Sequence, residues 1–177
     1  MSVLFIIRYF NKEGFTATFV LKPTCHLSYN IKVIDGKERV ALQAIQIQLT
    51  SVIRSFEGET DKYEMWLEGQ LTEKRDAHYI RYTEEQEAGT ITTIIKITED
   101  AALIMRSGAV TMRLPLHKKD PQTGHYTSAA GEMPLDIITK QLEHDTASGE
   151  FSTQYELAIS GQTVGLYTLK ITYTEVQ

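Results

Sequence analysis

The sequence contains a single cysteine, Cys25, together with four prolines and one tryptophan. One cysteine excludes an intrachain disulfide and gives no indication of an oxidising compartment. No apolar run approaches the roughly 20 residues that a transmembrane helix needs. The apolar residues 1–7 end at Arg8, and no small-residue cleavage site of the secretory kind follows them. We therefore expect a cytoplasmic protein that does not bind membranes.

Signatures of catalysis and of cofactor binding are also missing. The five histidines lack the close spacing and the paired carboxylates of zinc or iron sites. His117 and His125 flank one polar segment, where we expect them to be merely exposed. There is no Gly-x-Ser-x-Gly elbow, and the eleven glycines do not cluster into a phosphate-binding loop. We predict no catalytic residue, no metal and no cofactor.

The net charge of −5 is unevenly distributed along the 177 residues. Residues 1–40 carry a charge of +3, and the rest of the chain carries −8. An acidic body repels phosphate backbones, whereas nucleic-acid binding normally begins with a basic patch. We therefore predict that the protein does not bind nucleic acid. With 42% apolar and 23% charged residues, the composition is that of an ordinary globular domain.

A period of two between apolar and polar residues is the strongest pattern that is present. Ile45, Ile47 and Leu49, for example, alternate with Gln46 and Gln48. Such alternation is typical of an antiparallel strand with one buried face. The ten predicted strands are residues 41–54, 61–72, 78–83, 89–98, 101–106, 109–117, 126–130, 132–144, 150–160 and 164–175.

Short turns join most of these strands, and such turns force neighbouring strands to be antiparallel. Residues 118–124, interrupted by a proline and a glycine, form the longest predicted loop. A meander of this length would expose two unpaired edges unless it closed on itself. We therefore predict an all-β, antiparallel, up-and-down β-barrel of eight to ten strands.

Residues 1–40 do not continue the regular strand spacing. They could form an extra hairpin packed on the barrel, or an extension upstream of the natural start. We favour the extension, because residues 41–177 need no strand from this segment to close. The predicted domains are thus an N-terminal extension, 1–40, and a barrel, 41–177.

Three stretches of the predicted barrel, residues 90–112, 126–139 and 161–173, resemble the YwiB-like family, a domain of unknown function. The most specific piece is Ile104-Met105-Arg106-Ser107-Gly108-Ala109-Val110. The resemblance implies a calycin, or lipocalin-like, β-barrel in a small cytoplasmic protein of Gram-positive bacteria. It implies no activity, because the family has none established. Members usually begin near the strand that starts here at residue 41, which favours the extension.

A barrel of this size can enclose a small ligand if its inward positions are not all bulky. We therefore predict a small apolar ligand in the lumen, held by side chains with apolar bodies and polar tips. The alternative is that the same side chains simply fill the core. The predicted ligand-binding residues are Tyr63, Met65, Tyr82, Arg106, Met112, Tyr126 and Tyr155, with Met105 and Met133 as further lining.

Arg106, at a predicted strand end, has two possible roles. Its guanidinium could hold a carboxylate or phosphate through two parallel hydrogen bonds. Alternatively, it is a structural arginine that binds a carboxylate or backbone carbonyls at the barrel end. Arg81 and Arg113 are weaker candidates for the first role, and we expect each to lie on a solvated face or in a salt bridge.

Two further features have an ordinary explanation. Glu84, Glu85 and Glu87 precede Gly89, and we expect this acidic run to be a solvated turn. Trp66 falls on the polar side of its predicted strand. An exposed tryptophan would be a cue for binding, but we favour packing under a loop or under the N-terminal segment.

Three functions from different classes remain open. The first is a module that binds a small ligand in the barrel, and the second is a regulatory domain that binds an unknown protein partner through its outer surface. The third is an enzyme, which would need acidic and basic groups converging inside the barrel. We favour the ligand-binding module, and the enzyme ranks last.

Overall fold

The computed structural model describes residues 42–74, 76–129 and 131–176, and no helix occurs among them. The predicted extension, residues 1–40, lies outside the described residues. The ten strands are β1 (Leu42–Ser55), β2 (Thr60–Lys74), β3 (Ala77–Gln86), β4 (Gly89–Ile97), β5 (Ala101–Gly108), β6 (Thr111–His117), β7 (Gln122–Ser128), β8 (Gly131–Asp145), β9 (Glu150–Ile159) and β10 (Gln162–Glu175).

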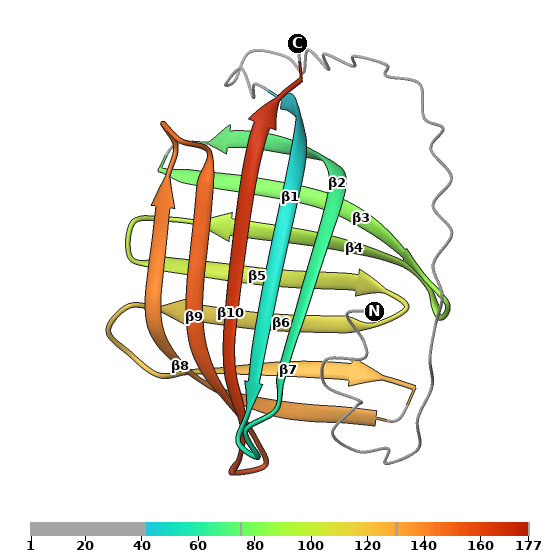
Figure 1. Ribbon diagram of the computed structural model, residues 1–177, viewed down its shortest axis with the longest axis vertical. Helices are drawn as coiled ribbons and strands as arrows, with labels where there is room; N and C mark the ends of the chain where they lie inside the picture. Colours follow the sequence, from blue (N-terminus) through green and yellow to red (C-terminus); the bar gives the residue numbers. More distant parts are fainter. Residues whose placement is uncertain (1–41, 75, 130, 177) are drawn as a thin grey trace. The chain divides into compact units, whose positions relative to one another are not determined.

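Every strand pairs antiparallel with the next one in the chain, and β1 also pairs with β10 (Figure 1). The closing pair is long and continuous, from Ile45 opposite Glu175 to Ser55 opposite Gly165. Closure removes both sheet edges, which is the physical reason that we expected it. The predicted up-and-down antiparallel barrel is therefore confirmed.

The strands fall into two groups that run in different directions. In the view of Figure 1, β1, β9, β10 and most of β2 lie roughly vertically, with β1 pointing down and β10 pointing up, whereas β3 to β7 run across the page behind them. Strand β2 pairs with β1 from Thr60 to Thr72, but with β3 only from Gly69 to Lys74. Residues 60–68 of β2 and residues 83–86 of β3 are therefore not paired with each other, and the two strands diverge beyond Gly69 and Tyr82.

Two local features lie where the chain passes from one group to the other. At Gly69 of β2, an added Cβ would lie 2.5 Å from Cδ1 of Ile47 and 2.8 Å from the carbonyl oxygen of Arg81. In β8, the register with β9 shifts by one residue between Thr139 and Gln141. Glycines and bulges at such places bend strands and allow a sheet to close.

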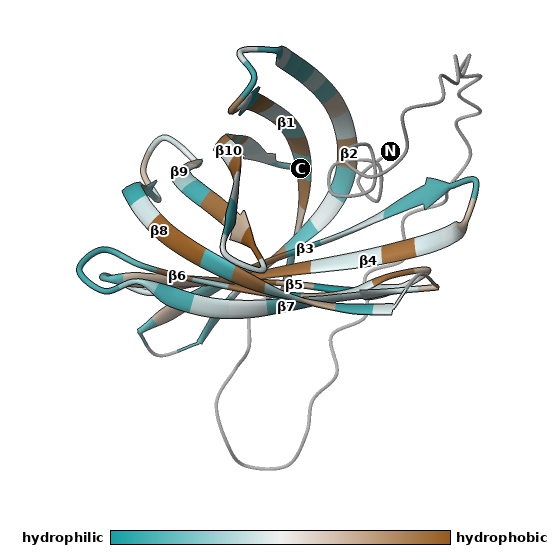
Figure 2. Cartoon of the chain, turned by 90° about the horizontal axis from the view of Figure 1, so that it is seen from below, coloured by the Kyte–Doolittle hydropathy of each residue, from teal (hydrophilic) through white to brown (hydrophobic). Residues whose placement is uncertain are grey.

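Alternate residues of the strands face the lumen, and apolar bands alternate with polar ones along β8 (Figure 2). Most of the buried residues that face inward are aliphatic, so the hydrophobic effect drives closure. The largest of the fully buried side chains are Tyr126, Phe151, Ile45, Ile47, Ile80, Ile91, Ile95, Ile97, Leu114, Leu116, Leu135 and Ile137.

One predicted loop is wrong at its end. Strand β7 begins at Gln122 and not at residue 126, so the loop after β6 is shorter than expected. Gly124 is a buried strand residue, where an added Cβ would lie 2.3 Å from the carbonyl oxygen of Arg113. The glycine is there because two backbones approach closely, and not because the chain turns.

Candidate functional site

A row of five side chains, four of them polar and the fifth that of Met112, crosses the lumen side of β3 to β7. Tyr82 lies directly opposite Thr93, Thr93 opposite Arg106, Arg106 opposite Met112, and Met112 opposite Tyr126. Because directly opposed residues share one face of a sheet, all five side chains point the same way. Tyr82, Thr93 and Tyr126 are buried, which identifies that face as the interior.

Arg106 of β5, at the centre of this row, forms an ion pair with Glu84 of β3. Nη2 of Arg106 lies 2.7 Å from Oε1 of Glu84 and donates a hydrogen bond to it. The two side chains are only 13% and 5% exposed, respectively. Since β3 and β5 flank β4 and do not pair with each other, the contact spans β4 on its lumen side. Arg106 thus pairs with a carboxylate, as expected for a structural arginine. The carboxylate is that of Glu84, which we had expected in a solvated turn.

The expectation of a solvated acidic turn was wrong for Glu84. Strand β3 continues to Gln86, so the alternation that buries Ile80 and Tyr82 also turns Glu84 inward. Glu85, at the intervening position, is exposed as expected. The sequence did indicate the burial of Glu84, because it lies two residues after Tyr82 and alternate residues of a strand face the same side.

The tyrosines near the pair are held in their neutral form. Burial raises the pKa of Tyr82, and the nearby Arg106 guanidinium offsets part of that rise. Tyr155, on β9, also has a raised pKa because it is desolvated, again with an opposing effect of Arg106. The pKa of Tyr126 is raised by burial, and Ser128 and Arg106 counteract it. Tyr155 thus interacts electrostatically with Arg106 although the two residues belong to β9 and β5, which do not pair with each other.

Three buried polar groups around the row reach no partner with full hydrogen-bond geometry. They are the hydroxyl oxygens of Thr93 and Tyr126 and the side-chain nitrogen of Gln86. Weaker contacts do exist, since Thr93 lies near the Tyr82 hydroxyl and Ser128 lies near Tyr126. A buried polar group without a well-formed hydrogen bond costs about 1–3 kcal/mol. The interior therefore retains hydrogen-bonding capacity that the protein itself does not fully use.

All seven predicted ligand-binding residues occupy inward positions. Besides the row, Tyr63 and Met65 occupy the half-buried, lumen-facing side of β2. Tyr155 stacks on Tyr167 of β10, with ring centroids 5.4 Å apart and planes inclined by 10°. The structure thus places these residues on the inner face of one barrel, and their role in binding a ligand stays a prediction.

Of the two further methionines, one was placed on the wrong face. Met133 lies directly opposite Tyr126 and faces the lumen. Met105 lies opposite Arg113 and alternates with the buried Ile104, so it belongs to the outer wall. A slip of one position exchanges the two faces of a strand, and this explains the error.

A second cluster lies where β8 ends and β9 begins. The rings of His144 and His78 meet edge to face with centroids 4.9 Å apart. Nε2 of His144 lies 3.1 Å from the hydroxyl of Tyr173, and His78 lies 3.7 Å from Glu73. Desolvation and the neighbouring His78 lower the pKa of His144, which Asp145 partly opposes. The cluster favours an uncharged His144.

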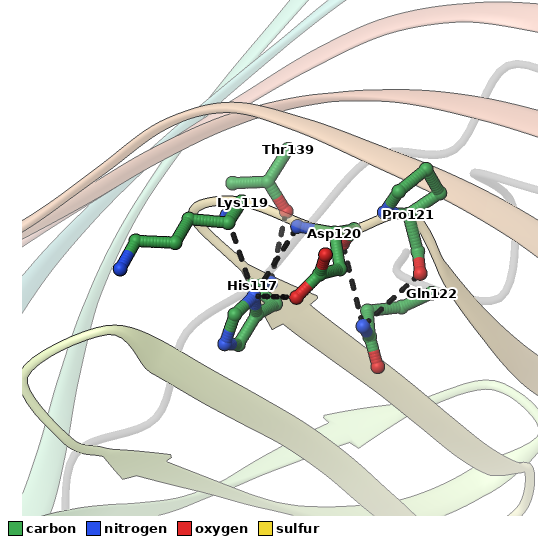
Figure 3. Close-up of polar contacts among 6 residues, drawn as sticks. All are labelled: His117, Lys119, Asp120, Pro121, Gln122 and Thr139. Carbon is green, nitrogen blue, oxygen red and sulfur yellow. Dashed lines mark hydrogen bonds and ion pairs between the residues drawn. The ribbon is translucent and has the colours of Figure 1, made fainter.

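His117 organises the loop between β6 and β7 (Figure 3). Its Nδ1 accepts hydrogen bonds from the backbone nitrogens of Lys119 and Asp120, at 3.3 and 3.2 Å, and lies 3.1 Å from Oδ2 of Asp120. Its own backbone nitrogen donates to Oγ1 of Thr139. His117 and His125 are half-buried, so the expectation that they are merely exposed was wrong.

The outer wall carries a shallow hollow of about 210 Å³ beside this loop. Lys96 and Arg113 supply positive charge, and Leu103 and Pro115 supply apolar surface. Arg113 thus lies outside the barrel, as does the exposed Arg81. Both therefore lie on solvated faces, as expected.

Trp66 is 68% exposed on the outer face of β2. The expectation that it packs under a loop of the barrel was therefore wrong, whereas the N-terminal segment, the other alternative, lies outside the described residues. Its neighbours Glu64 and Glu68 on the same face are also exposed. The tryptophan is an isolated aromatic side chain on a polar surface.

Two absences hold for the described part of the chain. None of its groups of His, Cys, Asp and Glu side chains is arranged to hold a metal ion. Nor does any helix in that part have the length and apolarity to cross a membrane.

The chemistry of the polar row suits recognition. Tyrosine and threonine hydroxyls both donate and accept, and a guanidinium presents several donors in a plane. The surrounding aliphatic wall suits an apolar body attached to one polar group. Such a combination positions a molecule by a few hydrogen bonds while apolar burial supplies most of the affinity.

Three comparisons relate this chain to known proteins. A family model described as a domain of unknown function (DUF1934) matches residues 47–171. The uncharacterized beta-barrel protein YwiB of Bacillus subtilis (strain 168) is 30% identical over 131 residues, which cover 73% of this chain and 92% of that protein. The crystal structure of the ywiB protein from Bacillus subtilis has a TM-score of 0.67 and 26% identity, covering 78% of this chain and 96% of that chain.

Proposed function

We propose that this chain, which belongs to the family described as a domain of unknown function (DUF1934), binds a small, largely apolar molecule inside its barrel. The apolar part contacts the aliphatic wall, and one polar group meets the row of Tyr82, Thr93, Arg106 and Tyr126. The proposal includes a calycin-like, or lipocalin-like, relationship and a cytoplasmic location. It includes neither an enzymatic activity nor a nucleic-acid partner.

The observation that carries this proposal is the buried hydrogen-bonding capacity of Thr93 and Tyr126. A barrel that served only as a scaffold would gain stability from a valine at Thr93, because the hydroxyl lacks a well-formed bond. A ligand with a hydroxyl or carbonyl group would satisfy these hydroxyls when it binds. The stability given up in the free protein would then be recovered in the complex.

Replacement of Thr93 tests the proposal with two readouts. Thr93→Val preserves the shape of the side chain and removes its hydroxyl. We expect a free energy of unfolding that is unchanged or higher by about 1 kcal/mol. The affinity for 1-decanol, measured by displacement of the neutral fluorophore N-phenyl-1-naphthylamine, should fall about fivefold to tenfold, the equivalent of one hydrogen bond.

Thr92→Val is the matched control. Thr92 lies on the outer face of the same strand, with its hydroxyl 3.5 Å from that of Thr83. Its replacement should leave the decanol affinity unchanged. If both variants bind decanol as tightly as the unaltered protein does, or if decanol does not bind at all, the proposed ligand site in the lumen is contradicted.

A function at the outer surface is the second candidate, and the exposed Trp66 favours it. Exposed tryptophans are over-represented among the residues that dominate protein interfaces. If a protein partner uses this face, Trp66→Ser should abolish the interaction without affecting decanol binding. Retention of decanol binding in Trp66→Ser would separate the two functions.

A further inference from the structure

We propose that Glu84 makes the lumen selective for uncharged ligands and excludes carboxylates. This inference rests on the proposed ligand-binding function and names the chemical class that the same site accepts. The polar group of the ligand is then an alcohol, ester, ketone or amide. Arg106 alone would have suggested the opposite preference, namely a carboxylate.

The charges of the row and of Glu84 balance one another. Arg106 and Glu84 are in direct contact and form a neutral unit. The tyrosines beside them are uncharged, since their acidity is weakened by burial. A bound carboxylate would therefore add a net negative charge to a poorly solvated interior. Burial of a charge without its own counter-ion is strongly unfavourable.

The geometry also places the carboxylate of Glu84 where a ligand carboxylate would have to bind. One oxygen of Glu84 lies 2.7 Å from Nη2 of Arg106. An incoming carboxylate would either compete for that nitrogen or bind beside Glu84, where two like charges repel each other. An uncharged oxygen avoids both effects, because it accepts hydrogen bonds from Arg106, Thr93 or Tyr126 without a change in net charge.

If only uncharged ligands bind, the affinity for a fatty acid must depend on pH. This dependence can be measured on the unaltered protein. A fatty acid would enter only in its protonated form, and each pH unit above the pKa of its carboxyl group reduces that form tenfold. The affinity for decanoate should therefore fall about tenfold per pH unit between roughly pH 6 and 8. The affinity for 1-decanol should be constant over this range, since the alcohol does not titrate.

A single substitution should reverse the preference. Glu84→Gln retains an oxygen that accepts from Arg106 but removes the negative charge. The guanidinium then lacks a counter-ion, and a ligand carboxylate can supply one. At pH 8 we expect decanoate to bind this variant about 30-fold more tightly than it binds the unaltered protein, the scale of a close charge pair at a buried site. The affinity for 1-decanol should change less than about threefold, because no charge is involved.

Glu85→Gln is the matched control. Glu85 is adjacent in sequence, but it is exposed and accepts hydrogen bonds from Oγ1 of Thr90 at 2.9 and 2.8 Å. The Glu85→Gln substitution removes one negative charge, as Glu84→Gln does, without altering the lumen. The control should show the affinities and the pH dependence of the unaltered protein.

The experiment measures displacement of N-phenyl-1-naphthylamine by 1-decanol and by decanoate from pH 6 to 8. The inference is supported if the unaltered protein prefers decanol to decanoate, Glu84→Gln removes this preference and Glu85→Gln retains it. If the unaltered protein binds decanoate at pH 8 as tightly as decanol, Glu84 does not select, although the barrel still binds ligands. If neither compound binds to any of the proteins, the ligand-binding function fails and the selectivity fails with it.

Discussion

Arg106 and Glu84 form an ion pair inside the barrel although the strands that carry them do not pair with each other. Thr93 of the intervening strand lies directly opposite Arg106, and Ile91 lies directly opposite Glu84. The pair therefore links β3, β4 and β5 on the lumen side. It also decides how much charge the interior presents to a ligand.

The first prediction concerns the stability that this pair contributes. Loss of one partner leaves an uncompensated charge, so Arg106→Met or Glu84→Leu alone should lower the free energy of unfolding by roughly 2–4 kcal/mol, somewhat below the cost at fully buried sites. The double variant with both changes should lie within about 1 kcal/mol of the unaltered protein, or above it, since an apolar pair avoids desolvation. Urea denaturation measures all three values.

A double variant that is as unstable as the less stable single variant would show that the pair itself stabilises the fold. The same double variant should bind decanol more weakly than the unaltered protein, because it lacks the Arg106 donors. A stable double variant with full decanol affinity would separate Arg106 from ligand recognition.

A second prediction uses two glycines with nearly equal φ angles. Gly108 has φ of 117° and Gly131 has φ of 120°, which alanine adopts at a cost of about 1–3 kcal/mol. An added Cβ at Gly108 would lie 2.1 Å from the carbonyl oxygen of Thr90, whereas at Gly131 it would meet nothing within 4 Å. Gly108→Ala should therefore lower the melting temperature clearly more than Gly131→Ala does. Equal losses would mean that β4 moves aside without penalty.

A third prediction concerns pH. Desolvation and the neighbouring His78 lower the pKa of His144 below its ordinary value of 6.5. The unfolded chain therefore takes up this proton at a higher pH than the folded protein does. The contribution of a neutral His144 is fully present above pH 6.5 and is lost as the pH falls toward the folded pKa, by at most about 1.4 kcal/mol per pH unit.

Thermal unfolding of the unaltered protein and of His144→Gln between pH 7.5 and 5 measures this contribution. The difference in stability between the two proteins should shrink or change sign as the pH falls. His125→Gln, which removes an imidazole from the outer wall, is the control. A constant difference between the unaltered protein and His144→Gln across this range would contradict the assignment.

A fourth prediction uses the single tryptophan of the chain. Because Trp66 is 68% exposed on the outer wall, Trp66→Ser should change the free energy of unfolding by no more than about 0.5 kcal/mol. Its fluorescence should have the emission of a solvated indole and should hardly respond to a ligand in the lumen. A large blue shift in the native state would show that a part of the protein covers this face.

The strand pattern could be predicted from the sequence because alternation is a local property of the chain. The alternation of Ile45, Ile47 and Leu49 with polar residues predicts a buried face without any tertiary information. The same holds for most of the other strands. The start of β7 could not be predicted in this way. Gly124 has the residue type of a turn, and the close approach of Arg113 that requires it is a contact between strands.

The lumen-facing tyrosines were predictable by the same parity, but the charge balance of the site was not. Glu84 stands in an acidic run, and its burial makes sense only when Arg106 lies across β4 from it. That contact depends on the registers of β3 with β4 and of β4 with β5. These registers are set by turn geometry and by pairing between strands, and the alternation within one strand does not show them. The sequence thus predicted a structural arginine paired with some carboxylate or carbonyl, and the structure identifies Glu84 as that partner.

The most direct test of a ligand site in the lumen is an NMR titration with 1-decanol of protein labelled with ¹⁵N in its arginines. Arg106 faces the interior and Arg113 faces the outer wall, so the two side chains report on opposite sides of the barrel. We predict that the Nε–H signal of Arg106 shifts until one equivalent is bound, while that of Arg113 stays in place. A shift confined to Arg113, or no shift at either residue, would contradict the account.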